Sequence, residues 1–174
     1  MFHIFLSLVF MTGNALADNS LMTFMRESDQ QKQIMVANSD GTNVRAITTG
    51  RFWHLYPAIS PNGVEVTYVS GEDGSNLHLV TKPLMQNGAT EQWTLDSQKG
   101  LILHPSYSGN GDLIGYSAPA SGVNQITYFN MRKTRLTAPK SDIMTPEGPR
   151  IAYRPEITVV NSPYPSFFPN FSSY

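Results

Sequence analysis

One short pattern occurs three times in this chain, and it constrains the fold more than any single residue does. Each copy contains a proline that follows an aromatic residue or a histidine and stands five residues before an asparagine. The copies span residues 55–63, 103–111 and 163–170, and their shared prolines, Pro57, Pro105 and Pro165, are 48 and 60 residues apart. Periods of this order indicate a stacked array of similar supersecondary units.

Two runs rich in β-branched and aromatic residues follow each of the first two copies, which predicts a pair of strands in each unit. The runs cover residues 64–70, 76–81, 112–117 and 124–130, and a similar pair at 21–25 and 33–38 precedes the first copy. Asp-Gly or Asn-Gly pairs begin at positions 40, 62, 73, 87 and 110, and such pairs supply the positive φ angles of tight hairpins. A further strand is expected at residues 44–48, 91–95 and 135–137.

Four antiparallel strands in each repeated unit describe a β-propeller blade. The sequence therefore predicts an all-β fold, a partial β-propeller of about three four-stranded blades with corners near residues 56–63, 104–111 and 164–171. Closed propellers use about four to eight blades, so these blades would not close a ring. We expect either that the propeller is truncated at its C-terminus or that a second chain supplies the remaining blades.

Two segments resemble a known repeat. Residues 34–48 are similar to its strand, Asp-Gly turn and Arg-x-Leu-Thr ending, and residues 57–63 are similar to its Pro-x-x-Ser-Pro-Asp-Gly corner. This is the repeat of the TolB-like β-propeller family, which includes periplasmic TolB-type propellers and the propeller domains of prolyl oligopeptidase relatives. The resemblance covers roughly residues 21–137 and 163–174, although the second copy lacks the second proline and the third lacks the serine and the glycine.

The first 17 residues have the pattern of a secretory signal peptide. Residues 4–11 form an apolar run of eight residues, too short for a membrane-spanning helix, and Ala15 and Ala17 place small residues where a signal peptidase reads. The first three residues carry no lysine or arginine, so a hydrophobic first strand or a mis-assigned start is the alternative. The pattern predicts a signal peptide at 1–17, a mature propeller segment at 18–174, and a periplasmic or secreted protein without a membrane span.

The composition argues against several classes of function. The chain has no cysteine, which excludes disulfides and a cysteine nucleophile, and its net charge of -1 gives no field for nucleic acid. Its 174 residues contain no Walker-type phosphate loop, Gly-x-Gly-x-x-Gly, His-Glu-x-x-His or Gly-x-Ser-x-Gly motif. The sequence therefore predicts a protein that is not an enzyme and needs no cofactor.

Histidines and turn aspartates are the candidates for a metal site. His54 and His104 lie near the start of the innermost strand of successive blades, where two imidazoles could join a metal or sugar site. They stand three residues and one residue before their prolines, so solvated loop histidines are the simpler interpretation. Asp40 and Asp73 each precede a glycine, which hairpin geometry explains without calcium. No metal site is predicted.

A loop aromatic and a basic insertion are the candidates for binding a partner. Trp53 follows Arg51 and Phe52 in an expected loop, where an exposed ring would be a binding hot spot and a buried one would pack the blade. Residues 132–154 carry six basic and two acidic side chains. Arg132, Lys133 and Arg150 are therefore candidates for contacting an acidic partner, and a solvated loop is the alternative. Residues 151–153 and 157–160 are expected to pair as an extra hairpin.

These observations favour a non-enzymatic TolB-like propeller that serves as a protein-binding scaffold. The resemblance implies envelope partners, such as a peptidoglycan-associated lipoprotein and the Tol complex. The alternative is the propeller domain of an enzyme, either a prolyl-oligopeptidase-like peptidase or a carbohydrate-active lyase.

Overall fold

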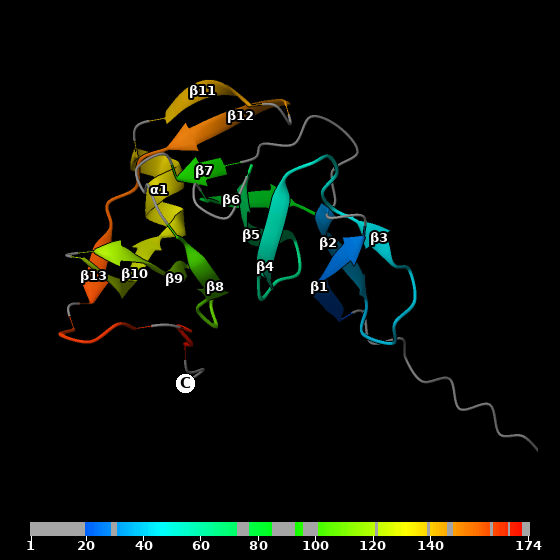
Figure 1. Cartoon of the computed structure of the whole chain (residues 1–174), viewed down its shortest axis with the longest axis horizontal. Coiled ribbons are helices and arrows are strands. Elements are labelled where there is room, and N and C mark those ends of the chain that lie inside the picture. The colour runs from blue at the N-terminus through cyan, green and yellow to red at the C-terminus, as the bar shows by residue number, and fades with distance from the viewer. Residues whose placement is uncertain are drawn as a thin grey trace, which may run out of the picture.

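The computed structural model describes residues 20–28, 31–72, 77–84, 93–95, 101–120, 122–138, 140–145, 148–160, 162–166 and 168–171. The predicted signal peptide and the expected turns at positions 73 and 87 lie outside these residues. The described strands form three units that follow one another along the chain (Figure 1).

The first unit is a hairpin with a short third strand. It consists of β1 (Leu21–Ser28), β2 (Gln31–Asn38) and β3 (Arg45–Ala46), with β2 pairing antiparallel to both of the others. Gly41 of the predicted turn has a φ of 82°. Asp40 Oδ1 accepts hydrogen bonds from the Thr42 hydroxyl at 2.7 Å and the Thr42 N–H at 2.9 Å, and these bonds lower the pKa of the Asp40 carboxyl. The Asp40 carboxylate is therefore used to stabilise the turn.

The second unit is a four-stranded blade, as predicted. Its strands β4 (Trp53–Ile59), β5 (Glu65–Gly71), β6 (His78–Pro83) and β7 (Trp93–Leu95) lie side by side in chain order, each antiparallel to the next. All seven residues of β5 are buried. The strand is buried because it lies between β4 and β6 and packs a neighbouring unit on each face.

The third unit starts in the same way but ends differently. Strands β8 (Leu103–Tyr107), β9 (Leu113–Ala120) and β10 (Val123–Asn130) are antiparallel neighbours, and the fourth strand is β13 (Thr158–Val160). The expected strand at 135–137 is wrong, because these residues end the helix α1 (Met131–Thr137). The helix starts there because the Asn130 side chain caps it, accepting a hydrogen bond from the Lys133 N–H at 2.7 Å.

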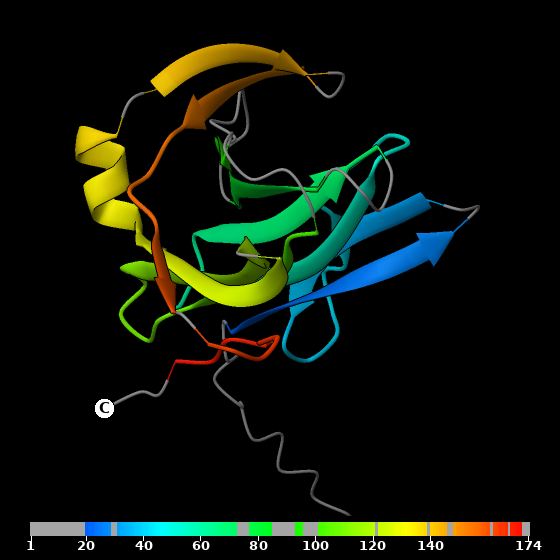
Figure 2. The same cartoon turned by 60° about the vertical axis from the view of Figure 1, so that its left-hand side comes forward.

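An insertion separates β10 from β13. It comprises α1 and the hairpin of β11 (Lys140–Thr145) and β12 (Gly148–Tyr153), which rises above the blades in Figure 2. Because β12 also pairs in parallel with β7, the insertion extends the outer edge of the second unit. The expected hairpin between residues 151–153 and 157–160 is therefore wrong: the first of these segments pairs with β11 and β7, and the second with β10.

The corner after the inner strand is built identically in the second and third units. The N–H groups of Gly63 and Gly111 donate at 2.8 Å to the carbonyls of Ser60 and Ser108. Each serine hydroxyl also bonds the asparagine two residues on, at 2.8 Å in the second unit and 2.7 Å in the third. The missing second proline of the third unit therefore does not alter the turn.

Two hydrophobic clusters join the three units. The first contains Val66, Tyr68 and Val80 of the second unit and residues of β2 such as Ile34. The second contains Val69 and Leu79 and residues of β9 such as Tyr116. Because neighbouring residues of a strand point to opposite faces, β5 and β6 pack one neighbour with each face. This is the stacking of propeller blades.

The stack is open within the described residues. One nine-stranded sheet has the order β1-β2-β4-β5-β6-β7-β12-β11, with β3 attached to β2, and a four-stranded sheet has the order β13-β10-β9-β8. The fold is thus mostly β with one short helix, and the sheets do not close on one another. No helix in this part of the chain has the length and apolar character needed to cross a membrane.

Candidate functional site

Three residues that precede prolines have left-handed backbone conformations. Tyr56, His104 and Phe168 have φ angles of 52°, 52° and 58°. Such angles cost a non-glycine residue about 1–3 kcal/mol and are concentrated at binding and catalytic sites. The pairing of β4 with β5 and that of β8 with β9 shift register at Tyr56 and at His104, respectively. The shared distortion therefore marks equivalent positions on successive inner strands.

The three side chains form a column of mutually tilted rings. The ring centroids of Tyr56 and His104 are 4.3 Å apart, and those of His104 and Phe168 are 4.0 Å apart. Burial lowers the pKa of the His104 imidazole, so the neutral ring is favoured there. Tyr56 is 37% exposed and Phe168 is 70% exposed. We call these three side chains the ring column.

The conformation of Phe168 shows that the third copy of the repeat is aligned differently from the sequence prediction. Phe168-Pro169, rather than Tyr164-Pro165, shares the conformation of the first two copies, and Tyr164 is exposed. Phe171 stands three residues after Phe168, as Tyr107 stands three residues after His104. Residues 168–171 therefore occupy the place of an inner strand beside the third unit.

An apolar groove adjoins the ring column. We call it the inner groove; its volume is about 400 Å³ and its lining residues are Met25, Lys32, Trp53, Leu55, Tyr56, Pro57, Leu77, Leu101 and Leu103. Tyr56 belongs to both features. The Lys32 ammonium lies 4.3 Å from the centroid of the Trp53 ring, and it is the single charged group among these lining residues. The groove thus presents apolar and aromatic surface beside one cation.

The two sequence candidates on β4 have different environments. Trp53 is half-buried and lines the inner groove. His54 is fully buried, with its ring edge-on to Tyr68 at 5.6 Å. The expectation of a solvated loop histidine is wrong for His54, because β4 begins at Trp53 and turns the next side chain into the core.

The basic residues of the insertion are partly neutralised within the fold. Lys133 forms an ion pair with Glu156, and Arg135 forms one with Glu65. Arg132 is exposed on α1. Arg150 lies in β12 at a position where the structure describes only the backbone. Arg132, Lys133 and Arg150 do not form one basic patch that the structure describes, and their role in binding a partner stays a prediction.

The Arg135–Glu65 pair extends into a buried network between the second and third units. The Tyr107 hydroxyl lies 2.5 Å from the Thr67 hydroxyl and donates to Glu65 Oε1 at 3.3 Å. Thr67 in turn lies 2.7 Å from the Thr81 hydroxyl. Burial, together with the charge of Glu65, raises the pKa of Tyr107 above its usual range. These bonds join the second and third units.

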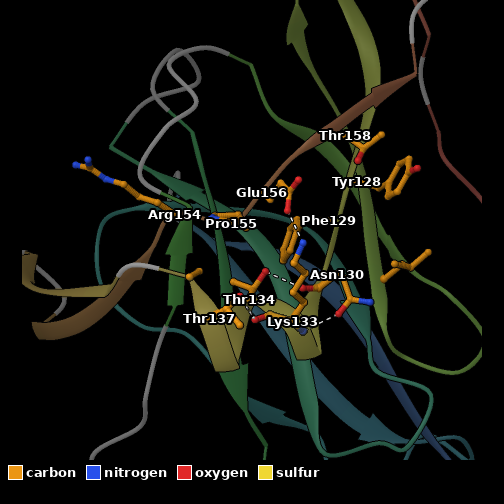
Figure 3. Close-up of a pocket in the computed structure, with 12 residues that line it drawn as sticks. Tyr128, Phe129, Asn130, Lys133, Thr134, Thr137, Arg154, Pro155, Glu156 and Thr158 are labelled. Carbon is orange, nitrogen blue, oxygen red and sulfur yellow. Dashed lines mark hydrogen bonds and ion pairs between the residues drawn. The ribbon is translucent and has the colours of Figure 1, made fainter.

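A second cavity lies beside the helix. We call it the helix pocket; its volume is about 450 Å³, and it is formed by the ends of β9 and β10, by α1, and by residues 154–158 (Figure 3). The Lys133–Glu156 ion pair joins two of its walls. The sequence does not predict this pocket, because it indicates a strand at 135–137, a loop and a hairpin of residues 151–153 with 157–160 where the insertion forms α1, β11 and β12.

Across the described residues, no three histidine, aspartate or glutamate side chains come close enough together to hold a metal ion. The His104 ring contacts the aromatic rings of Tyr56 and Phe168, whereas the His54 ring contacts Tyr68 in the core. His54 and His104 are therefore not brought together, and His104 belongs to an aromatic surface.

No protein-family profile matches this chain. Its fold is similar to the crystal structure of TolB from Acinetobacter baumannii, with a TM-score of 0.54 and 22% sequence identity. The match covers 74% of this chain and 34% of the TolB chain, so the similar region spans about a third of that protein. This likeness shows a TolB-like propeller fold and agrees with the blade order described above.

Proposed function

We propose that this chain is a non-enzymatic, exported propeller module that binds another protein at the inner groove and the ring column. The observation that carries the proposal is the partly exposed Tyr56 ring, which a distorted backbone holds at the junction of these two features. Backbone strain of this kind persists where the surrounding structure fixes it, and it is often part of a binding site.

The chemistry of the groove suits a protein partner. Aromatic residues and methionine are enriched at the centres of protein interfaces, where a few of them supply most of the binding free energy. Met25, Trp53 and Tyr56 meet in the inner groove, and Met25 is among the exposed large hydrophobic residues. A rigid aromatic pair with an adaptable methionine is a suitable surface for an apolar side chain.

The charge at the groove specifies the partner further. Lys32 is directly opposite Glu27 in the β1–β2 pairing, but Glu27 does not line the groove. The ammonium of Lys32 is therefore the charge that an incoming segment meets. We propose that the partner presents an apolar side chain next to a carboxylate.

Side chains, rather than strand addition, are the means of recognition in this proposal. The inner strands β4 and β8 carry Pro57 and Pro105, which lack a backbone N–H. Each strand is also distorted at the residue before the proline. Proline and bulges discourage a further strand from pairing with a sheet edge.

The test is a selection of peptides from a random displayed library on the purified chain. We expect enrichment of sequences with an apolar residue beside Asp or Glu. Trp93→Phe leaves Trp53 as the only tryptophan, so its fluorescence reports binding at the groove. Tyr56→Asn keeps a residue that tolerates the left-handed conformation and should weaken binding about 30-fold, the size of a hot spot.

Two charge variants and one matched control complete the test. Lys32→Gln should weaken acidic peptides about fivefold, and Glu27→Gln should strengthen them slightly. Val44→Ser alters an exposed residue outside the groove lining and should leave binding unchanged. Selected peptides that bind Tyr56→Asn as tightly as the unmodified chain would place the binding surface elsewhere and overturn the proposal.

A further inference from the structure

The helix pocket is a concave site that the repeat pattern does not require. It exists because the insertion leaves the third unit after β10 and returns at residues 154–158 before β13. The C-terminal segment covers the same sheet elsewhere: Phe171 approaches the position that a Cβ of Gly115 would take, and Ser117 donates to the Ser166 carbonyl at 2.9 Å. The pocket lies next to this covered region, and its volume of about 450 Å³ is that of a small-molecule site.

Some polar groups of the pocket are already used by the helix. The hydroxyls of Thr134 and Thr137 donate to the carbonyls four residues earlier, at 2.7 and 2.9 Å. The Asn130 side-chain oxygen accepts the capping hydrogen bond from Lys133. The donors of these hydroxyls are therefore used within the helix, and only the lone pairs of their oxygens stay open to a ligand.

Other polar residues line the pocket without such bonds. Tyr128 and Thr158 are directly opposite each other in the β10–β13 pairing, and neither hydroxyl bonds to another residue in the described ranges. The Asn130 amide nitrogen is likewise not bonded within them. Figure 3 shows the Tyr128 ring beside Thr158, with Asn130 and the Lys133–Glu156 pair nearby. The pocket therefore offers hydroxyl, amide and charged groups around one half-exposed aromatic ring.

The two charged groups that meet at the pocket, Lys133 and Glu156, have opposite signs. Lys133 and Glu156 are paired with each other, with side chains 60% and 77% exposed, and this pair lowers the pKa of the Glu156 carboxyl. Arg154 also borders the pocket, but its side chain extends away from the other labelled residues in Figure 3. A charged ligand would meet a like charge beside any opposite one, whereas a neutral ligand meets donors and acceptors at once.

We infer that the helix pocket binds a neutral saccharide. A sugar ring carries several hydroxyl groups that both donate and accept hydrogen bonds, which suits the Lys133 ammonium, the Glu156 carboxylate and the Asn130 amide. Its C–H face is apolar and suits the Tyr128 ring, an aromatic surface with a polar end. This inference concerns a site separate from the inner groove and goes beyond the proposed protein-binding function.

The test uses three probes that share one ring and differ in charge: D-glucose, D-glucuronate and D-glucosamine. Saturation-transfer NMR and titration on the full chain measure binding of each probe. We expect glucose to bind with a dissociation constant of about 1–10 mM, and each charged probe to bind at least threefold more weakly.

Conservative variants locate the site. Tyr128→Leu keeps the apolar bulk and removes the aromatic face, Thr158→Val removes one hydroxyl, and Glu156→Gln removes the balancing charge. We expect each to weaken glucose about three- to tenfold, and Glu156→Gln to improve binding of glucuronate relative to glucose. Lys140→Met changes an exposed lysine on β11 outside the pocket lining and should have no effect.

Three results would overturn the inference. They are the absence of glucose binding by the unmodified chain, tighter binding of glucuronate than of glucose, and unchanged glucose binding in both Tyr128→Leu and Thr158→Val. Tyr56→Asn should leave saccharide binding intact, so failure at the helix pocket is distinguishable from failure at the inner groove. Circular dichroism of each variant confirms that lost binding does not reflect lost folding.

Discussion

The second and third units share their inner halves and differ in their outer halves. Both have a distorted residue before proline, the same serine-centred corner and a fully buried tyrosine on the next strand, Tyr68 or Tyr116. The second unit then completes its blade with β6 and β7, whereas the third interrupts it with α1, β11 and β12. The inner two strands and their corner thus define the repeat, and the outer strand accepts an insertion.

The largest expected effect tests whether the two inner halves are equivalent. Tyr68 and Tyr116 each stand six residues after the asparagine of their corner, and both are buried between units. Tyr68→Ala and Tyr116→Ala should each lower the free energy of unfolding by about 3–5 kcal/mol, measured by urea denaturation. A loss confined to one of them would show that the units are not equivalent in stability.

The next prediction compares the loss of two tyrosine hydroxyls, one hydrogen-bonded and one without a hydrogen-bond partner among the described residues. The Tyr107 hydroxyl bonds Thr67 and Glu65, while the buried Tyr116 hydroxyl has no hydrogen-bond partner among the described residues. Tyr107→Phe should therefore cost about 1–3 kcal/mol, and Tyr116→Phe should be close to neutral. Chemical denaturation of both variants decides this. Equal losses would contradict the assignment of the network as the bond between units.

A third prediction concerns equivalent positions on β5 and β9, where each strand faces the segment that follows its unit. Thr67 of the second unit contacts Tyr107, and Gly115 occupies the corresponding position of the third. A Cβ at Gly115 would lie 3.1 Å from the Phe171 ring, so Gly115→Ala should destabilise the chain by about 1 kcal/mol. The double variant with Phe171→Leu should recover most of this loss, as thermal unfolding would reveal. Without such recovery, the C-terminal segment does not dock as described.

The smallest effect is a pH dependence of the ring column. Burial lowers the pKa of His104 in the folded chain, so the unfolded chain binds more protons in the interval between the two pKa values. Stability should be complete above the ordinary histidine pKa and should fall as the pH drops through that interval. His104→Phe should remove this component of the pH profile. The opposite slope would mean that the Tyr56 and Phe168 rings stabilise the imidazolium more than burial disfavours it.

The strands were predictable where an Asn-Gly turn is followed by a run rich in β-branched and aromatic residues. Asn62-Gly63 and Asn110-Gly111 place the corners, and β5 and β9 follow them as expected. Helix α1 was not predicted, because its seven residues are too few to show an apolar period and its cap, Asn130, ends a strand pattern. Residues 157–160 were expected as a strand, but the pairing of β13 with β10 was not predicted, because 27 residues separate the two strands.

The candidate site was predictable only in part. Trp53 was a candidate because it is an aromatic residue in an expected loop. The residues before Pro57 and Pro105 were recognisable as part of the repeated pattern. The contact between the Tyr56 and His104 rings was not predictable. The left-handed conformation of an aromatic residue depends on the tertiary structure that tolerates it. The inner groove combines Met25, Trp53 and Leu101 from separate units and linkers, and no local pattern links such distant residues.

The parallel pairing of β12 with β7 has a consequence for how the chain unfolds. Repeat units that contact each other only as stacked faces can lose structure one at a time. Here a hairpin that leaves the third unit is hydrogen-bonded to the outer strand of the second, joining residues 93–95 to residues 151–153. Separating either unit must break this long-range strand pairing, so the two units should unfold together in one cooperative transition. They should also fold slowly, because the pairing of β7 with β12 closes a large loop.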